Sequence, residues 1–316
     1  MSRFVIRRLI GAVPLLLGVA VLSYAFMQLA PGSPDDLYAR NTRMSEAQLE
    51  AIRHNMGLDK PAYIQFLRWL GNLVQGDLGT STSQYRPVRE VIWEVFPNTA
   101  FLVLTGLLIS LVVSLAFGVL AAVRPFGIFD NLTSFVSYFG LAMPVFWFGL
   151  MLQILFSVKL GWLPSASMHS PRGSGAWDLA KHLALPALTI AIGSIASWSR
   201  YVRSSTIESL GQDYVRTARA KGLQEQTVLW GHVLRNALVP FVTVVSIDIP
   251  LYLTGAVLTE TVFSWPGMGR LFYDALTKRD YPVLMGILVL GAVLIIIGNL
   301  VADLIYGVLD PRIKYA

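Results

Sequence analysis

Residues 98–123 read NTAFLVLTGLLISLVVSLAFGVLAAV, an apolar run without a single charged side chain. A helix needs about 20 apolar residues to cross the hydrocarbon core of a bilayer, which is about 30 Å thick. This run is long enough, and its two glycines stand apart instead of clustering as they do in turns. The run predicts a transmembrane helix, and the other apolar stretches of the chain can be compared with it.

Five other stretches have a comparable apolar character. The fourth of the resulting six is the shortest and contains Ser194 and Ser197, with Ser199 directly after it, and the first follows three arginines, as a secretory signal peptide would. The apolar core of a signal peptide has only about 7–15 residues, so we predict an uncleaved first span. The chain is expected to be an all-α polytopic membrane protein with six transmembrane helices, at 9–30, 98–123, 132–158, 183–198, 237–259 and 283–308.

The composition of the 316-residue chain fits this interpretation. Hydrophobic residues make up 54% and charged residues 14%, whereas a soluble domain carries about 25% charged residues. The absence of cysteine excludes disulfides, thiolate metal sites and a cysteine nucleophile. The sequence has no Gly-Lys pair of a phosphate-binding loop and no HExxH or GxSxG motif, and its four histidines lie in different segments. We therefore expect no ATPase site, no resident cofactor and no metal.

The distribution of positive charge predicts the orientation of the spans. Lys and Arg gather in the cytoplasmic connections of membrane proteins. With the N-terminus inside, the segments on that side carry a clear excess of basic residues, whereas the outer segments are nearly balanced. Both termini are therefore expected in the cytoplasm. The cytoplasmic excess explains the net charge of +6, so membrane lipid and no nucleic acid is expected as a partner. The inner basic residues are Arg3, Arg7, Arg8, Arg124, Arg200, Arg203, Arg216, Arg219, Lys221, Arg235, Arg312 and Lys314.

The first long connection, residues 31–97, is expected outside. Ser45 and Gln48 form a capping-box pattern that predicts a short helix to about residue 55. The apolar spacing from Lys60 to Val74 predicts a second, amphipathic helix.

The second long connection, residues 199–236, is expected inside and is basic. The chain then divides into an N-terminal helix with its outer loop, residues 1–97, and a five-span core, residues 98–316.

Residues 211–223, GQDYVRTARAKGL, are the most informative part of the inner connection. Asp213 fits an N-cap and Gly222 fits a left-handed residue after the helix end. They enclose about two helical turns, too few to persist alone in water. The residues leave two interpretations open: the helix docks in a groove of a partner protein, aided by its small alanines, or it lies against lipid headgroups. The candidate contact residues are Asp213, Arg216, Thr217, Ala218, Arg219, Ala220, Lys221 and Gly222.

Features of the apolar spans suggest how the helices pack and where a cargo passes. The small residues Gly106, Ser110, Ser114, Gly118 and Ala122 recur every fourth residue, which predicts close helix packing. Pro144 predicts a kink in the third span. Its neighbours Met143, Phe146 and Trp147 either line a path or face lipid.

Asp248 is an ionisable residue in the middle of the fifth span. Such a group costs roughly 2.5–3.5 kcal/mol in lipid, so it should face a wet cavity or a partner. It could attract a cationic cargo group, form a hydrogen bond to a neighbouring helix, or serve as the proton site of an ion-coupled transporter.

An aromatic turn, FSWPGMG at residues 263–269, follows the fifth span. Exposed aromatic turns are rarely without a partner, so Phe263, Trp265, Pro266 and Gly267 are expected either to face another protein outside or to cap the bundle.

Several motifs resemble the permease subunits of ABC importers of the dipeptide and oligopeptide class. Residues 214–223, YVRTARAKGL, followed by HVLRNALVP at 232–240, are similar to the cytoplasmic loop of that family. Residues 260–269, ETVFSWPGMG, resemble its signature after the fifth span. The shorter motifs MPVFW, GLDKP, GDLG and DPR extend the likeness over the whole chain, and it is nearest to the "B" permease subunits of dipeptide importers.

The resemblance implies a type I ABC importer permease core with one extra N-terminal span, in a bacterial cytoplasmic membrane. It implies inward transport of short peptides by this chain, a second homologous permease subunit, two ABC ATPase subunits that use ATP and Mg, and an extracytoplasmic substrate-binding protein. Residues 213–222 would be the coupling helix, and residues 263–267 would face the binding protein.

Two alternatives to this function remain open. Related permeases also carry nickel complexes, glutathione or oligosaccharides, and the sequence does not separate these cargoes. A proton-coupled secondary transporter using Asp248 would usually be built from repeated halves, and the chain shows none.

Overall fold

The computed structural model describes residues 2–29, 47–48, 50–51, 54, 59–171, 173, 175–253 and 256–309. These residues form helices and connecting turns, and no strand is found among them beyond an isolated bridge between Thr80 and Pro87. Five helices are long and apolar enough to cross a membrane, or six spans result if one bent pair counts as a span. The helix expected after Ser45 lies largely outside the described residues.

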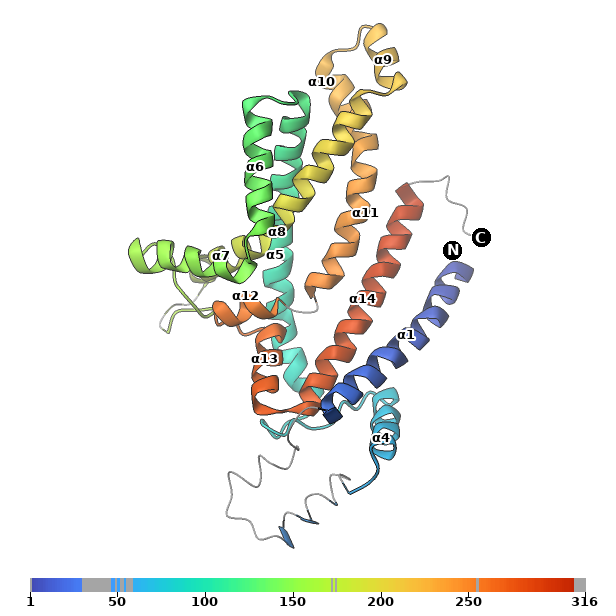
Figure 1. The fold of residues 1–316 in the computed structure, drawn as a ribbon, viewed down its shortest axis with the longest axis vertical. Coiled ribbons are helices and arrows are strands. Elements are labelled where there is room, and N and C mark those ends of the chain that lie inside the picture. Colours follow the sequence, from blue (N-terminus) through green and yellow to red (C-terminus); the bar gives the residue numbers. More distant parts are fainter. Residues whose placement is uncertain are drawn as a thin grey trace.

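Five long helices form the body of the molecule (Figure 1). They are α1 (Ser2–Leu29), α5 (Val88–Val123), α8 (Ala176–Leu210), α11 (Leu234–Leu253) and α14 (Tyr281–Leu309). The shorter α-helices are α4 (Ala62–Val74), α6 (Ile128–Ala142), α7 (Val145–Leu152), α9 (Asp213–Ala220), α10 (Glu225–Thr227), α12 (Val257–Val262) and α13 (Met268–Lys278). Two π-helical segments, η1 (Gln153–Lys159) and η2 (Val228–Val233), continue α7 and precede α11.

The core lies where α5 packs against α8, and the stripe of small residues in the second span is confirmed as the contact. All five of its residues are buried. A Cβ added to Gly118 would lie 2.6 Å from the Cβ of Val202 and 2.8 Å from the backbone oxygen of Ser199. The small residues let the two backbones approach closely.

The fourth span is longer than its hydropathy suggests. We predicted 183–198, whereas α8 has 35 residues. Its serines lower the hydropathy, yet Ser194 and Ser199 are buried against protein instead of facing lipid. The helix also continues to Leu210, so the inner connection expected at 199–236 consists partly of helices that extend from the bundle.

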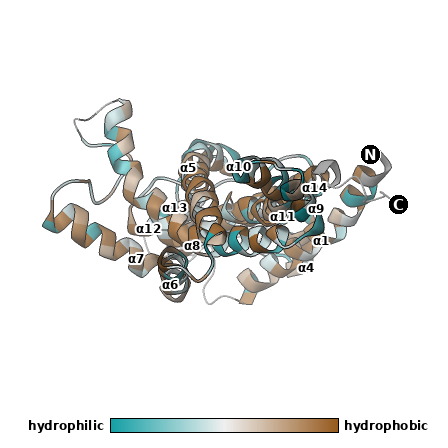
Figure 2. Ribbon diagram, turned by 90° about the horizontal axis from the view of Figure 1, so that it is seen from above, coloured by the Kyte–Doolittle hydropathy of each residue, from teal (hydrophilic) through white to brown (hydrophobic). Residues whose placement is uncertain are grey.

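The third span, expected at 132–158 with a kink at Pro144, is broken at that proline into two helical parts. α6 and the α7–η1 pair meet at an angle of 106° (Figure 1). Met143 has an extended backbone, as the residue before a proline prefers, and Pro144 begins the new direction. Seen from above, α7 projects sideways from the bundle and is coloured largely hydrophobic (Figure 2). Gly149 allows α7 to pack tightly on α8 and α12, because a Cβ there would lie 3.2 Å from Thr189 and 3.1 Å from Phe263.

One further span boundary differs from the prediction, and one predicted helix is confirmed. The fifth span was expected to reach residue 259, but α11 ends at Leu253 and α12 is a separate short helix. The amphipathic helix at 60–74 is confirmed as α4, which Gly76 ends in a left-handed conformation with φ of 81°.

Candidate functional site

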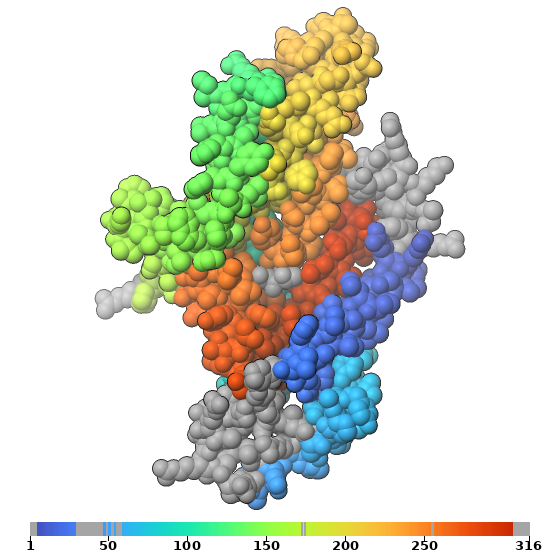
Figure 3. Space-filling view, viewed as in Figure 1, coloured from blue at the N-terminus to red at the C-terminus, as the bar shows by residue number. Residues whose placement is uncertain are grey.

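The short helix α9 lies at one extreme of the molecule, beyond the ends of α5 and α6 (Figure 1). It connects the extension of α8 to the segment formed by α10 and η2, which leads into α11. Figure 3 shows this region protruding from the body in yellow and light orange. A force on α9 therefore acts directly on two helices of the bundle.

One face of α9 is fixed to its own chain. Val215 and Ala218 are buried against Val228 and Val233 in a small apolar cluster. The spacing of three residues places Val215 and Ala218 on the same helix face. Ala218 was expected to seat α9 in a partner groove, and this expectation is wrong because its side chain packs inward.

The C-terminal end of α9 forms as predicted. Gly222 is left-handed with φ of 75°. Its amide donates to the carbonyl of Arg219 at 2.9 Å, and the amide of Leu223 donates to the carbonyl of Ala218 at 3.4 Å, the two bonds of a Schellman motif. The N-terminal expectation is wrong: Gln212 occupies the N-cap position without a side-chain bond, and Asp213 lies in the first turn.

The outward face of α9 combines positive charge with apolar surface. Arg219 forms two bonds with Glu225, at 2.8 and 3.1 Å, which brace α9 against α10. Nearby, 68% of Trp230 and 39% of Leu223 are exposed. Exposed apolar side chains beside basic ones suit contact with a protein partner. The exposed members of the predicted set are Asp213, Arg216, Thr217, Arg219, Ala220, Lys221 and Gly222.

The predicted pathway residues do not gather in one place. Asp248 of α11 accepts a hydrogen bond from the indole of Trp198 in α8, at 2.7 Å. Trp198 is fully buried and packs edge-on against Phe241. Asp248 therefore has the neighbouring-helix partner that one of its interpretations required.

The other pathway candidates follow the break between α6 and α7. Phe146 and Trp147 are 42% and 44% exposed, and Met143 and Pro144 form the break itself. α7 packs on α8 and α12, whereas α11 packs on α14 and α8. The helix that carries Phe146 and Trp147 and the helix that carries Asp248 therefore pack in different helix–helix contacts.

The aromatic turn after the fifth span points inward, which agrees with the interpretation that it caps the bundle and not with exposure to another protein. Phe263 and Trp265 are 1% and 0% exposed, Gly267 is buried and Pro266 is half-buried. The indole of Trp265 donates to the backbone carbonyl of Asn98 at 3.0 Å, and the side-chain amide of Asn98 donates to the backbone carbonyl of Pro266 at 2.8 Å. The turn is thereby fastened to the start of the apolar part of α5.

A buried carboxyl group organises the same turn. Glu260 is fully buried and accepts hydrogen bonds from the hydroxyl of Thr99 at 2.8 Å and the amide of Arg270 at 3.0 Å. Burial raises the pKa of Glu260, against the opposing effect of these donors. The sequence reasoning missed this role, because the contact between Thr99 and Glu260 joins segments 161 residues apart.

A second buried carboxyl group joins the outer loop to α14. Asp280 accepts hydrogen bonds from the amide and hydroxyl of Ser83, at 3.0 and 2.7 Å, and from Ser81 and Thr82. Burial alone would raise the pKa of Asp280, but these donors outweigh it and hold the pKa below its ordinary value of 3.8. No pattern in the sequence predicted this contact.

Replacing Asp280 with Ala should destabilise the protein by about 1–3 kcal/mol, because the buried donors of the outer loop lose their acceptor. A carboxyl group with a depressed pKa stabilises the folded state above its ordinary pKa, and this stabilisation is lost as the pH falls through the folded-state pKa. Thermal unfolding in detergent should show that the wild type loses more stability than Asp280→Asn when the pH is lowered from about 5 to below the ordinary pKa of 3.8. Equal pH dependence of the two proteins would contradict this role.

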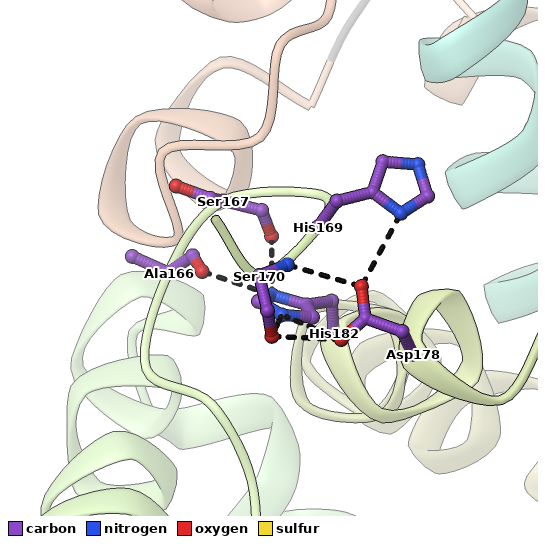
Figure 4. Close-up of polar contacts among 6 residues, drawn as sticks. All are labelled: Ala166, Ser167, His169, Ser170, Asp178 and His182. Carbon is purple, nitrogen blue, oxygen red and sulfur yellow. Dashed lines mark hydrogen bonds and ion pairs between the residues drawn. The ribbon is translucent and has the colours of Figure 1, made fainter. Parts of the chain in front are cut away.

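A third polar cluster fixes the loop that precedes α8 (Figure 4). The Nδ1 of His182 donates to the carbonyls of Ala166 and Ser167, both at 3.0 Å, and its Nε2 lies 3.1 Å from the hydroxyl of Ser170. Asp178 bonds Ser170 at 2.7 Å instead of the Nδ1 of His182. The arrangement therefore lacks the acid–imidazole bond of a hydrolytic triad.

Two histidines from different segments of the sequence lie beside the same carboxylate here. His169 and His182 lie 3.4 and 3.7 Å from the carboxylate of Asp178. Within the described part of the chain, no group of three or more His, Asp or Glu side chains could hold a metal ion.

A further unforeseen contact ties α6 to α8. The guanidinium of Arg203 forms two bonds with the carboxylate of Asp130, whose side chain is 2% exposed. Arg203 is one of the basic residues predicted on the inner side, but its pairing with Asp130 was not predicted, because 73 residues separate the two.

Comparison with known proteins places this geometry in a family. Residues 114–315 match the family described as binding-protein-dependent transport system inner membrane component, and residues 1–103 match its N-terminal component. The oligopeptide transport system permease protein AppB of Bacillus subtilis is 44% identical over 317 residues, covering 100% of both chains. The dipeptide transport system permease protein DppB of Escherichia coli K12 is 38% identical, covering 100% of this chain and 99% of that protein.

A solved structure shows the same fold. The inward-facing MetNI methionine ABC transporter matches with a TM-score of 0.56 and 18% identity, over 70% of this chain and 97% of that chain.

The multi-span helical fold, together with the family model and the full-length relatives, identifies a multi-pass membrane subunit of an ABC importer. The chain belongs to the family of binding-protein-dependent transport system inner membrane components. This family works with ATPase and substrate-binding partners, and its members reside in the inner membrane.

Proposed function

We propose that this chain translocates short peptides inward as one of two permease subunits, together with two ABC ATPases and an extracytoplasmic binding protein. The supporting observation is its full-length similarity to oligopeptide and dipeptide permeases, at 44% and 38% identity. ATP and Mg belong to the partner ATPases in this proposal. Both termini, and with them α9, lie in the cytoplasm.

In this proposal α9 is the coupling helix. Its inner face is held by Val215 and Ala218, and its outer face with Arg216 and Lys221 is available to an ATPase. Movement of the ATPase would shift α9 together with the extensions of α8 and α11. The membrane-surface alternative predicts the same exposed charge but no ATPase contact.

The burial of the aromatic turn leaves α4 as the better candidate contact for the binding protein. Its residues Tyr63, Leu67 and Val74 are 66%, 60% and 82% exposed, while Gln65 accepts a hydrogen bond from Tyr24 of α1 at 3.3 Å. The helix is thus held to the membrane part by one face and uncovered on another.

The test of cargo and partners is copurification. The tagged chain, extracted in mild detergent, should bring down a second permease and two kinds or copies of ATPase, and the binding protein encoded with it should release short peptides when denatured. Release of nickel complexes, glutathione or oligosaccharides instead would replace the peptide cargo and leave the permease class intact.

Replacing Asp248 with Asn distinguishes the roles of this residue, because the amide oxygen can still accept the bond from Trp198. If the charge attracts a peptide ammonium group, uptake of a free dipeptide should fall about tenfold, equivalent to 1.4 kcal/mol, while uptake of its N-acetylated form stays unchanged. Unaltered uptake of both would assign Asp248 a packing role only. Trp198→Phe, which keeps an aromatic ring but has no N–H, is the matched control for loss of the hydrogen bond.

A further inference from the structure

The first half of the third span, α6, is attached to the rest of the chain mainly through polar side chains. α6 buries Asp130 and Ser137, which are 2% and 3% exposed. Its apolar residues Leu132, Phe135 and Phe139 are 57%, 67% and 57% exposed. Apolar burial within this chain therefore contributes little to holding α6, so its polar contacts decide which neighbouring helix it follows.

The buried polar side chains of α6 face α8, which lies beside it (Figure 1). Ser137 follows Asp130 by about two helical turns, so the two residues share one face of α6. The hydroxyl groups of Ser137 and Ser199 lie 3.2 Å apart. Next to them, the guanidinium of Arg200 lies 4.6 Å from the ring centre of Tyr138. The contact with α8 thus extends along α6.

The pair of Asp130 and Arg203 is the charged part of this contact. Both carboxylate oxygens accept bonds from the guanidinium, and the bond from Nη2 to Oδ2 is 2.7 Å long. Two parallel charged bonds fix the orientation of the helices as well as their distance. The carboxylate also accepts a bond from the amide of Phe126 at 2.7 Å. Phe126 has a φ of 63°, which is strained for a large side chain, so Asp130 also holds the turn that begins α6.

Arg203 lies in the part of α8 that leads to α9. α8 is continuous to Leu210, about two turns beyond Arg203, and α9 begins at Asp213. Leu210 packs against the apolar cluster that contains Val215 of α9, so the end of α8 and α9 are joined by side chains as well as by the backbone. A displacement of α9 therefore reaches Arg203 directly, and Arg203 holds α6.

We propose that the pair of Asp130 and Arg203 makes α6 move together with α8 and α9, so that movement of the ATPase reaches the third span. This inference rests on the proposed function, because it takes α9 as the contact with the ATPase. Asp130 and Arg203 are positioning residues in it, since they act through α6. Loss of the pair separates the movement of α6 from that of α9 while α9 keeps its own anchor.

Asp130→Asn is the test variant. The amide oxygen of Asn can still accept the bond from Phe126, whereas the charged contact with Arg203 is lost. The side chain of Arg203 is 26% exposed and can turn toward water, so the variant should fold. Glu208→Gln is the matched control, because it removes a negative charge from an exposed position on the same part of α8.

The first measurement is the uptake of a radiolabelled dipeptide per ATP hydrolysed by the full complex in proteoliposomes. A merely structural role would lower uptake and hydrolysis together and leave their ratio unchanged. We expect the ratio to fall about two- to tenfold in Asp130→Asn, the usual size for mutations that weaken coupling. The ratio should stay at the wild-type value in Glu208→Gln.

The second measurement follows the movement itself. The chain has no cysteine, so spin labels can be attached at Leu132→Cys and Gln212→Cys alone. Leu132 is exposed on α6, and Gln212 precedes α9 without a side-chain cap bond. The distance between the labels should be the same in the nucleotide-free complex and in the complex trapped with ATP and vanadate. With Asp130→Asn added, the distance should differ between the two states.

Three results would contradict the proposal. One is a label distance that changes between the two states without the Asp130→Asn substitution, which is a comparison that depends on no test variant folding. Another is an unchanged uptake-to-ATP ratio in Asp130→Asn whose folding is verified by size-exclusion elution and circular dichroism. The third is an unlabelled wild-type complex that shows no ATP-driven uptake, which would refute the proposed function and this inference with it. The first two leave the proposed function intact.

Discussion

Replacing Val215 with Asp should abolish ATP-driven uptake while the protein still inserts into the membrane. Val215 is 0% exposed and lies in the apolar cluster that holds α9. An unpaired carboxylate cannot remain in such a cluster without a large desolvation cost, so α9 would leave its base. Because an eight-residue helix is not stable alone in water, the link to the ATPase would be lost.

The measurement is the ATPase activity of the purified complex with and without loaded binding protein. We expect loss of the stimulation by binding protein together with loss of uptake in proteoliposomes. Val215→Leu is the matched control, since it retains an apolar side chain at the same place. Normal stimulation in the Asp variant would show that α9 need not be anchored and would remove it from the coupling mechanism.

Replacing Gly118 with Leu should prevent the stable packing of α5 on α8. The first added atom would already meet Val202 at 2.6 Å and the backbone of Ser199 at 2.8 Å. The backbone oxygen cannot move aside as a flexible side chain would. Overpacking of a core costs about 1–3 kcal/mol and sometimes more, and this contact is the largest in the core.

The thermal unfolding midpoint and the amount of protein in the membrane both measure this effect. We expect a clear decrease in each for Gly118→Leu and a smaller decrease for Gly118→Ala. Gly18→Leu supplies the control in an uncrowded helix. If Gly118→Leu unfolds at the wild-type temperature, the close approach of α5 and α8 is not needed for stability.

The features that the sequence predicted well are those encoded locally. Long apolar runs predicted the spans, the amphipathic spacing predicted α4, and Gly222 predicted the end of α9. The stripe containing Gly118 predicted a packing face because small residues matter there for their size alone. None of these inferences requires knowing which distant segment lies opposite.

The features that the sequence did not predict depend on distant partners. Hydropathy cannot separate an aromatic side chain exposed to solvent from one enclosed by protein, so the sequence left open whether Trp265 faces a partner or is buried in the bundle. Pro144 indicated a kink, but the angle of 106° is set by packing of α7 on α8 and α12. Asp280 gave no signal, since its partners lie almost 200 residues away.

The same distinction applies to the candidate site. The sequence located α9 and its charged residues, but it assigned Ala218 to a partner groove when its neighbours are Val215 and Val228. Sequence spacing shows which residues share a helix face, while only the fold shows whether that face looks inward or outward. The outward face with Arg216 and Lys221 remains the proposed ATPase contact.

The central claim is that energy from a separate ATPase reaches the membrane helices through α9. The most direct measurement is peptide uptake into proteoliposomes that contain this chain, with its partner subunits present or omitted, and driven either by internal ATP or by a proton gradient. We expect uptake only with the ATPases and ATP, and none by the chain alone under either driving force. Uptake by the chain alone, or uptake that follows the proton gradient, would contradict it.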